Sequence, residues 1–98
     1  MITKSYSKTG QVCRVTFRVP AEIEAENVSV LGEFNEWKPE AHPLKARKNG
    51  TFSTTLSLES GQSYRFRYLA DGQHWLNDDQ ADEYAPNRFG ERDGVLGV

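Results

Sequence analysis

The chain has 98 residues, of which 12 are basic and 14 are acidic, so its net charge is −2. This length suits one domain whose core needs no disulfide support, and a single cysteine excludes a disulfide framework or a zinc cluster. The mixed charges disfavour a nucleic-acid-binding protein, and no apolar run is long enough to span a membrane. We therefore expect a soluble, cytoplasmic domain that uses no cofactor and no metal and binds neither nucleic acid nor membrane.

The N-terminal part divides into an arm and a strand. Residues 1–10 are polar and lack a period, so we expect a loosely ordered arm outside a domain at 11–98. From Val12 to Val19 apolar and polar residues alternate, which predicts a strand with one buried and one solvated face. Its inward side chains are Cys13, Val15, Phe17 and Val19, and its outward ones are Arg14, Thr16 and Arg18. Pro20 ends the strand, and residues 21–26 are long enough only for a short helical turn.

A second strand and a tight loop come next. Residues 28–31 suit a pleated, partly buried strand, and Gly32 permits a bulge or a close backbone approach. Asn35 tolerates turn geometry, so we expect the strand to end in a tight loop. Phe34 adjoins the apolar strand and is predicted to be an inward anchor, whereas Trp37 has polar neighbours and is predicted to be a displayed ring.

The dipeptide Asn49-Gly50 is the clearest hairpin signal in the chain. It separates a short strand-like run at 44–47 from a longer one at 52–58. Asparagine and glycine both tolerate positive φ, so they suit the two central positions of a type I′ turn. We therefore predict an antiparallel hairpin closed by that turn.

The C-terminal half consists of further turns and short strands. The predicted elements are, in order, a turn at 60–62, a strand at 64–70, a turn at Asp71-Gly72 and a short edge strand at 74–76. We interpret residues 77–87 as a long polar loop and residues 95–98 as the last strand. Frequent turns between about six to eight short strands, without a convincing helix, indicate an all-β chain folded as an antiparallel β-sandwich.

Two motifs carry a resemblance to a known family. They are Gly-x-Phe-Asn-x-Trp at residues 32–37 and Asp-Gly-x-x-Trp at residues 71–75, with a C-terminal strand after Asn87. Together they resemble the family 48 carbohydrate-binding modules of isoamylases, glycogen branching enzymes and the AMP-activated protein kinase β subunit. The resemblance covers roughly residues 28–98. It implies an immunoglobulin-like sandwich of the early-set type that binds α-1,4-linked glucan, as glycogen, starch or maltooligosaccharides, and is not an enzyme.

The same resemblance implies which residues bind the sugar. Trp37 and Trp75 stand where the family stacks two tryptophans on glucose rings. Arg67 stands at the place of a lysine that bonds sugar hydroxyls, and Asp93 at the place of an asparagine that does likewise. Arginine still offers donors, but a carboxylate can only accept, so the hydroxyl network would be rearranged. Asn77 is a further candidate for bonding hydroxyls, and one extra residue before Trp75 would shift the second ring.

Other chemistry has less support. A glycosidase needs two carboxyls across a cleft; Glu33 and Glu36 share one loop and four acidic residues lie within 78–83, but a sandwich of this size offers little cleft. The acidic run lacks the spacing of an EF-hand, so we predict a solvated loop rather than a calcium site. Cys13 faces inward and is predicted to be a buried, inert thiol.

Two alternatives of a different class stay open. The domain could be a protein–protein interaction module, or an accessory domain of a glycogen branching or debranching enzyme that has not retained sugar binding. The partner would then be an amylolytic catalytic domain or another protein instead of a glucan. The sequence also leaves open whether the chain is complete or part of a larger enzyme.

Overall fold

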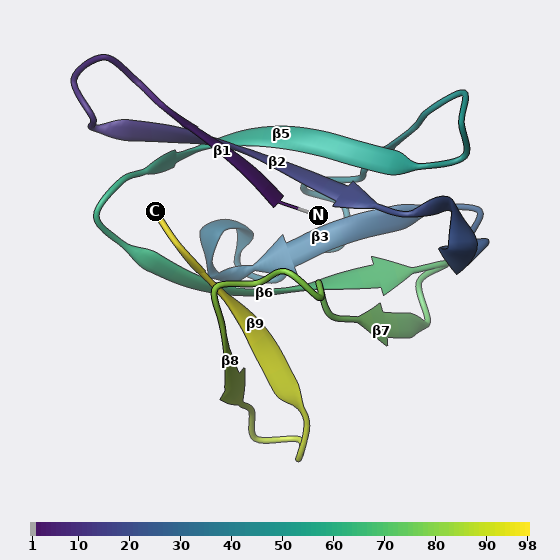
Figure 1. Cartoon of the computed structure of the whole chain (residues 1–98). Helices are drawn as coiled ribbons and strands as arrows, with labels where there is room; N and C mark the ends of the chain where they lie inside the picture. The colour runs from purple at the N-terminus through teal and green to yellow at the C-terminus, as the bar shows by residue number, and fades with distance from the viewer. Residues whose placement is uncertain (1) are drawn as a thin grey trace.

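The computed structural model describes residues 2–98, which form nine strands and two short 3-10 turns. The strands make two antiparallel sheets that lie face to face (Figure 1). The strands are β1 (Ile2–Tyr6), β2 (Val12–Val19), β3 (Val28–Gly32), β4 (Lys45–Ala46), β5 (Phe52–Glu59), β6 (Ser63–Ala70), β7 (His74–Leu76), β8 (Glu83–Pro86) and β9 (Arg92–Gly97). The turns are η1 (Ala21–Ile23) and η2 (Glu33–Asn35). No helix within residues 2–98 has the length and apolar character that crossing a membrane requires.

The strand order identifies the architecture. One sheet has the order β1-β2-β5-β4, and the other has the order β3-β6-β9-β8, with β7 paired to β6. In immunoglobulin-type sandwiches the first, second, fifth and fourth strands form one sheet, and the third, sixth and last strands form the other. The chain reproduces this order and adds β7 and β8. The predicted fold class is therefore confirmed.

Alternating side chains from both sheets fill the core. On β2 every second residue is buried, as the alternation predicts, and these residues are Cys13, Val15, Phe17 and Val19. The ring centroid of Phe17 lies 5.4 Å from that of Phe66 and 6.4 Å from that of Tyr68, in the edge contacts that aromatic quadrupoles favour. The same alternation leaves the outer face of each sheet available for binding.

Two strands are absent from the sequence-based prediction. β1 pairs with β2, with Ile2 opposite Phe17, so residues 2–6 form a strand where a loose polar arm is expected. β8 pairs with β9, so the stretch predicted as a loop at 77–87 contains a strand. Both strands lie at sheet edges, where polar side chains are common and the apolar alternation is weak.

The predicted hairpin at Asn49-Gly50 forms, but its turn is of another type. Hydrogen bonds donated by the N–H groups of Arg47 and Gly50 close a three-residue loop, in which only Gly50 has a positive φ, of 88°. Such a loop is a type I turn followed by a left-handed residue. The positive φ angles that a type I′ turn needs occur instead at Asp71 and Gly72, with values of 53° and 68°.

The acidic stretch after β7 is only partly the solvated loop that the sequence predicts. Asp78 is buried, and its Oδ2 accepts a hydrogen bond of 2.7 Å from the Tyr68 hydroxyl, while its Oδ1 accepts one of 2.8 Å from the Gln80 N–H. Burial, and then the charge of Asp78, raises the pKa of Tyr68 above its ordinary range. Within residues 2–98 no group of three or more His, Cys, Asp or Glu side chains is arranged to hold a metal ion.

Lys4 connects the two sheets. Its Nζ donates to Asp82 Oδ2 and to the Gly97 carbonyl oxygen, both at 2.7 Å, and the Gly97 N–H donates to the same Asp82 oxygen at 2.8 Å. Partial burial opposes ionisation of Asp82, but the bonds from Lys4 and Gly97 and the charge of Lys4 together lower the pKa of this carboxyl. Since both side chains are partly exposed, the ion pair stabilises the fold only modestly.

We expect Lys4→Gln to lower the melting temperature at pH 7 by at most about 5 °C, since exposed ion pairs contribute ~1 kcal/mol or less. The depressed pKa of Asp82 means that the stabilisation is present above about pH 3.9, the ordinary aspartate pKa, and is lost as the pH falls. The difference between the two proteins should therefore vanish near about pH 2. Thermal melts across this pH range measure it, and a difference that persists in acid would point to packing instead of charge.

Candidate functional site

Chemically suited side chains gather on the outer face of the β3-β6-β9-β8 sheet. Residues paired across antiparallel strands point to the same side, so Leu31 on β3 lies beside Arg67 on β6. By the same rule Leu69 on β6 lies beside Trp75 on β7. Leu31 and Leu69 are both buried, although they lie outside the main core cluster. This outer face therefore combines an apolar floor with a cation and an indole ring.

Arg67 and Trp75 are in direct contact. Cζ of Arg67 lies 5.5 Å from the ring centroid of Trp75, which is a cation–π distance, and its Nη1 donates to Glu91 Oε1 at 2.7 Å. Trp75 is 45% exposed, whereas the Arg67 side chain is only 11% exposed. Nε of Arg67 is buried and has no partner within residues 2–98. Arg67 is thus held between an indole and a carboxylate, and it is not simply a solvated charge.

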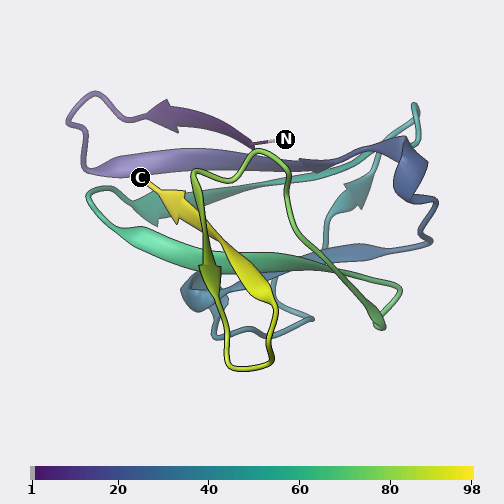
Figure 2. The ribbon, with the colours of Figure 1, turned by 60° about the horizontal axis from the view of Figure 1, so that its bottom comes forward.

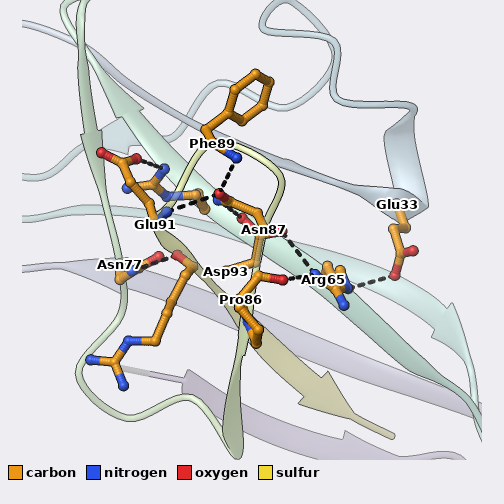
Figure 3. Close-up of polar contacts among 10 residues, drawn as sticks. Glu33, Arg65, Asn77, Pro86, Asn87, Phe89, Glu91 and Asp93 are labelled. Atoms are coloured by element: carbon orange, nitrogen blue, oxygen red, sulfur yellow. Dashed lines mark hydrogen bonds and ion pairs between the residues drawn. The ribbon is translucent and has the colours of Figure 1, made fainter.

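The β8–β9 hairpin projects from the sandwich (Figure 1 and Figure 2), and it carries Glu91, the partner of Arg67. Asn87 holds its turn, because Oδ1 accepts the N–H of Phe89 at 3.0 Å and that of Glu91 at 3.1 Å (Figure 3). Phe89 is 75% exposed at the tip, and its ring points away from the polar network. The hairpin therefore displays a third aromatic ring two residues from the partner of Arg67.

Asp93 lies on β9, within this hairpin. It is 6% exposed, its Oδ1 accepts a bond of 3.1 Å from Asn87 Nδ2, and its Oδ2 lies 3.5 Å from Arg65 Nη1 (Figure 3). Because both carboxylate oxygens are engaged and shielded, the geometry favours a positioning role through Asn87. Asn77 is exposed, and its Nδ2 donates to the Arg92 carbonyl oxygen at 2.9 Å.

The loop that carries Trp37 is tied to the same sheet. Glu33 Oε1 accepts the backbone N–H of Arg65 at 2.7 Å (Figure 3). Within the loop, Asn35 Oδ1 accepts the Gly32 N–H at 3.0 Å, and Asn35 Nδ2 donates to the Val30 carbonyl oxygen at 2.9 Å. A single asparagine side chain thus closes the turn, while Glu33 connects the turn to β6.

The two aromatic residues of this loop have different environments. Phe34 packs inward, with its centroid 5.8 Å from that of Phe17, as predicted. Trp37 is half-buried and so is less exposed than a displayed ring. Glu36 and Trp37 have left-handed φ angles of 57° and 59°, which are unfavourable for bulky side chains. Strain of this kind is concentrated at functional sites.

The structure brings together only some of the predicted site residues. Arg67 and Trp75 touch, Asp93 braces the β8–β9 hairpin through its bond from Asn87, and Asn77 bonds to the backbone of the same hairpin. Trp37 stands on a separate loop that Glu33 joins to β6. The sequence analysis does not single out Glu91 and Phe89; the aromatic residue within a turn-forming Asn-Arg-Phe-Gly stretch is the signal that indicates Phe89.

Comparison with known proteins gives consistent matches. The model of a family described as the glycogen recognition site of AMP-activated protein kinase matches residues 15–95. Over 74 residues the chain is 35% identical to the 1,4-alpha-glucan branching enzyme GlgB 2 of Xanthomonas campestris pv. campestris (strain 8004), a match that covers 74% of this chain and 10% of that enzyme. Over 64 residues it is 34% identical to the 1,4-alpha-glucan branching enzyme GlgB of Thiobacillus denitrificans, covering 63% of this chain and 8% of the enzyme. The chain thus spans about a tenth of the length of these curated relatives.

Proposed function

Because the chain belongs to the carbohydrate-binding family that contains the glycogen recognition site of AMP-activated protein kinase, we propose that it binds α-1,4-linked glucan. The observation that carries this proposal is the exposed indole of Trp75, held against Arg67 on an open sheet face. The matched relatives are named as 1,4-alpha-glucan branching enzymes, which favours the same polymer.

The chemistry of the outer face suits a neutral sugar. A glucose ring has an apolar face of C–H groups and a rim of hydroxyls, so it needs a flat aromatic surface with donors and acceptors nearby. Trp75, Trp37 and the exposed Phe89 offer such surfaces. Arg67 supplies N–H donors from the end of its guanidinium, and the Glu91 carboxylate supplies acceptors. These donors and acceptors could therefore bond the hydroxyls of a glucose ring that is stacked on an aromatic side chain.

The expected affinity is modest. If an indole covers about 100 Å² of apolar sugar surface, ~25 cal/mol/Å² gives ~2.5 kcal/mol for one ring and ~5 kcal/mol for two. Association costs at least about 4 kcal/mol, so hydrogen bonds must supply the remainder. We expect a Kd between ~10 µM and ~1 mM. Such affinity is adequate for a polymer that presents many sites to several modules.

The partner of such a module would be a catalytic domain that acts on the same polymer. The family is a carbohydrate-binding module, which is a non-catalytic domain. The chain matches about a tenth of the length of proteins that are named as branching enzymes, so those relatives are much longer than this domain. We propose that this domain keeps a catalytic domain of that kind on its glucan.

Titration of the whole chain with maltoheptaose tests the proposal. We expect a saturable change in tryptophan fluorescence with a Kd in the range ~10 µM to ~1 mM, because the exposed indole of Trp75 lies on the outer face. The β-linked cellohexaose, which presents the same rings in another geometry, is the matched control and should bind more weakly. A flat response from a folded protein would favour the protein–protein interaction module, and hydrolysis of starch would instead indicate an enzyme.

A further inference from the structure

The outer face of the other sheet, formed by β1, β2, β5 and β4, is basic. The register shows which residues point outward, because Ser53 on β5 lies between Arg18 on β2 and Lys45 on β4. Arg14 shares this face, and along these four strands the one acidic residue at an outward position is Glu59, at the far end of β5. In a chain with a net charge of −2 this face is therefore a region of opposite sign.

One end of this face is hollowed into an open depression of about 530 Å³. It lies next to the β4–β5 hairpin, whose turn precedes β5 in Figure 1. Arg18, Arg47 and Lys48 line it together with hydroxyl and amide side chains, and no acidic residue does so. The volume is that of a small-molecule site, but every lining residue is polar or charged, whereas such sites are usually lined by hydrophobic and aromatic side chains. This lining favours a ligand that carries negative charge and hydroxyl groups.

The donors of the depression are held in place before any ligand binds. Nε of Arg47 donates to Ser53 Oγ at 2.7 Å, and Ser53 forms the floor with only 5% of its surface exposed. Asn49 Oδ1 accepts the N–H of Thr51 at 3.1 Å and its hydroxyl at 2.7 Å, which stiffens the turn that carries Lys48. Within residues 2–98 neither the Nη groups of Arg47 nor Lys48 has a hydrogen-bond partner. The arginine fork therefore faces the depression with both Nη groups available.

We infer that this depression binds the phosphomonoester group of a phosphorylated sugar. An arginine fork matches two oxygens of a phosphate, and a lysine ammonium adds a point charge beside it. The hydroxyls of Ser53, Thr51 and Thr55 can bond the hydroxyls of the sugar. The ligand has two sources, a free sugar phosphate or a glucan that carries phosphate esters. The site lies on the sheet opposite Trp75, so this inference does not depend on the proposed glucan binding.

An NMR titration of the ¹⁵N-labelled whole chain with inorganic phosphate, at an ionic strength held constant with sodium chloride, tests the inference. Saturable shifts are expected at the backbone amides of residues 47–55, and glucose 6-phosphate should shift the same amides whereas glucose should not. Arg47→Gln and Lys48→Gln should each weaken phosphate binding by about fivefold or more, since each removes a charge-assisted bond. The matched control is Arg14→Gln, a basic residue of the same face outside the depression, which should stay within about twofold.

The two sources are separated with a phosphorylated glucan before and after phosphatase treatment. Tighter binding of the phosphorylated polymer, lost in Lys48→Gln, assigns the site to phosphate esters on glucan; binding of glucose 6-phosphate alone assigns it to the free sugar phosphate. Equal weakening by Arg14→Gln, or shifts scattered over the surface, would show diffuse attraction and overturn the site. A glutamate-rich peptide that binds here when phosphate does not would also overturn it, in favour of an acidic protein partner. Melting temperatures and maltoheptaose affinities of the variants, expected to match the wild type, exclude misfolding.

Discussion

Replacement of Trp75 by alanine is expected to weaken maltoheptaose binding roughly 60-fold, the equivalent of ~2.5 kcal/mol for one lost stacking surface of about 100 Å². The loss should be confined to binding, because Trp75 lies on the short strand β7 and is already 45% exposed. Removing the indole also uncovers the guanidinium of Arg67, which then loses its cation–π contact and its fixed orientation. Calorimetric or NMR titrations measure the affinity, and thermal melts check the fold.

Tyr6→Ala is the matched control for this substitution. Tyr6 is 52% exposed, so its removal deletes a comparable aromatic surface, but it lies on β1 of the opposite sheet. The affinity of the Tyr6→Ala variant for maltoheptaose should equal that of the wild type. Comparable losses in both variants would mean that binding is not specific to the outer face, and an unchanged affinity of Trp75→Ala with an unchanged melting temperature would contradict the assignment of Trp75.

Most of the fold follows from the sequence because most strands bury one face. The period of two in β2 and β6 identifies which side chains enter the core, and the structure buries Phe17, Phe66 and Tyr68 accordingly. β1 and β8 lie at sheet edges, so their pairing rests on backbone hydrogen bonds that leave no apolar pattern in the sequence. The type I′ turn predicted at Asn49-Gly50 occurs at Asp71-Gly72 instead, because both dipeptides tolerate positive φ, and loop length, which selects the type, depends on strand register.

The site is less predictable because its geometry depends on contacts between distant segments. The contact between Arg67 and Trp75 belongs to a local hairpin, so a motif in the sequence can carry it. The burial of Asp93 depends on the pairing of β9 with both β8 and β6, and the sequence gives no register for either pair. Asn87 accepts a bond from the Phe89 N–H at the tip of the β8–β9 hairpin, where the Phe89 side chain is exposed. The carboxylate that is expected to bond sugar hydroxyls is therefore buried, and an aromatic ring that the sequence analysis does not single out is exposed.

The distribution of charge over the surface also depends on the fold, and the sequence alone does not predict it. A net charge of −2 argues against an anionic ligand for the molecule as a whole. Strand alternation nevertheless sends Arg14 and Arg18 to one face of β2, and the β4–β5 hairpin adds Lys45, Arg47 and Lys48 beside them. The net charge is a sum over faces that the fold separates. It therefore limits the charge of the whole surface but not the charge of one sheet. The two proposed sites therefore lie on opposite sheets, and we expect them to bind independently.

Gly32→Ala is expected to destabilise the fold by about 3 kcal/mol, the upper range for overpacking, and to lower the melting temperature by roughly 12–24 °C. An added Cβ would lie 2.5 Å from the Arg65 carbonyl oxygen and 2.9 Å from both Phe34 Cε2 and Phe66 Cβ. The φ of Gly32 is −169°, so its backbone conformation suits any residue and the contact alone is unfavourable. The carbonyl oxygen can retreat only if the pairing of Gly32 with Phe66 opens.

Gly97→Ala separates this effect from the general cost of replacing a strand glycine. An added Cβ at Gly97 would lie 3.8 Å from Asp82 Oδ2 and 3.9 Å from Ser63 Oγ, which is ordinary contact. We expect its stability to stay within about 1 kcal/mol of the wild type, or to rise, since alanine loses less backbone entropy than glycine on folding. Because the loop with Trp37 begins at Gly32, the Gly32 variant should also bind maltoheptaose more weakly at temperatures where it remains folded, whereas the Gly97 variant should not. If the thermal melts of the two variants coincide, the close approach of β3 to β6 does not require glycine. The conformation of the Trp37 loop would then not depend on Gly32.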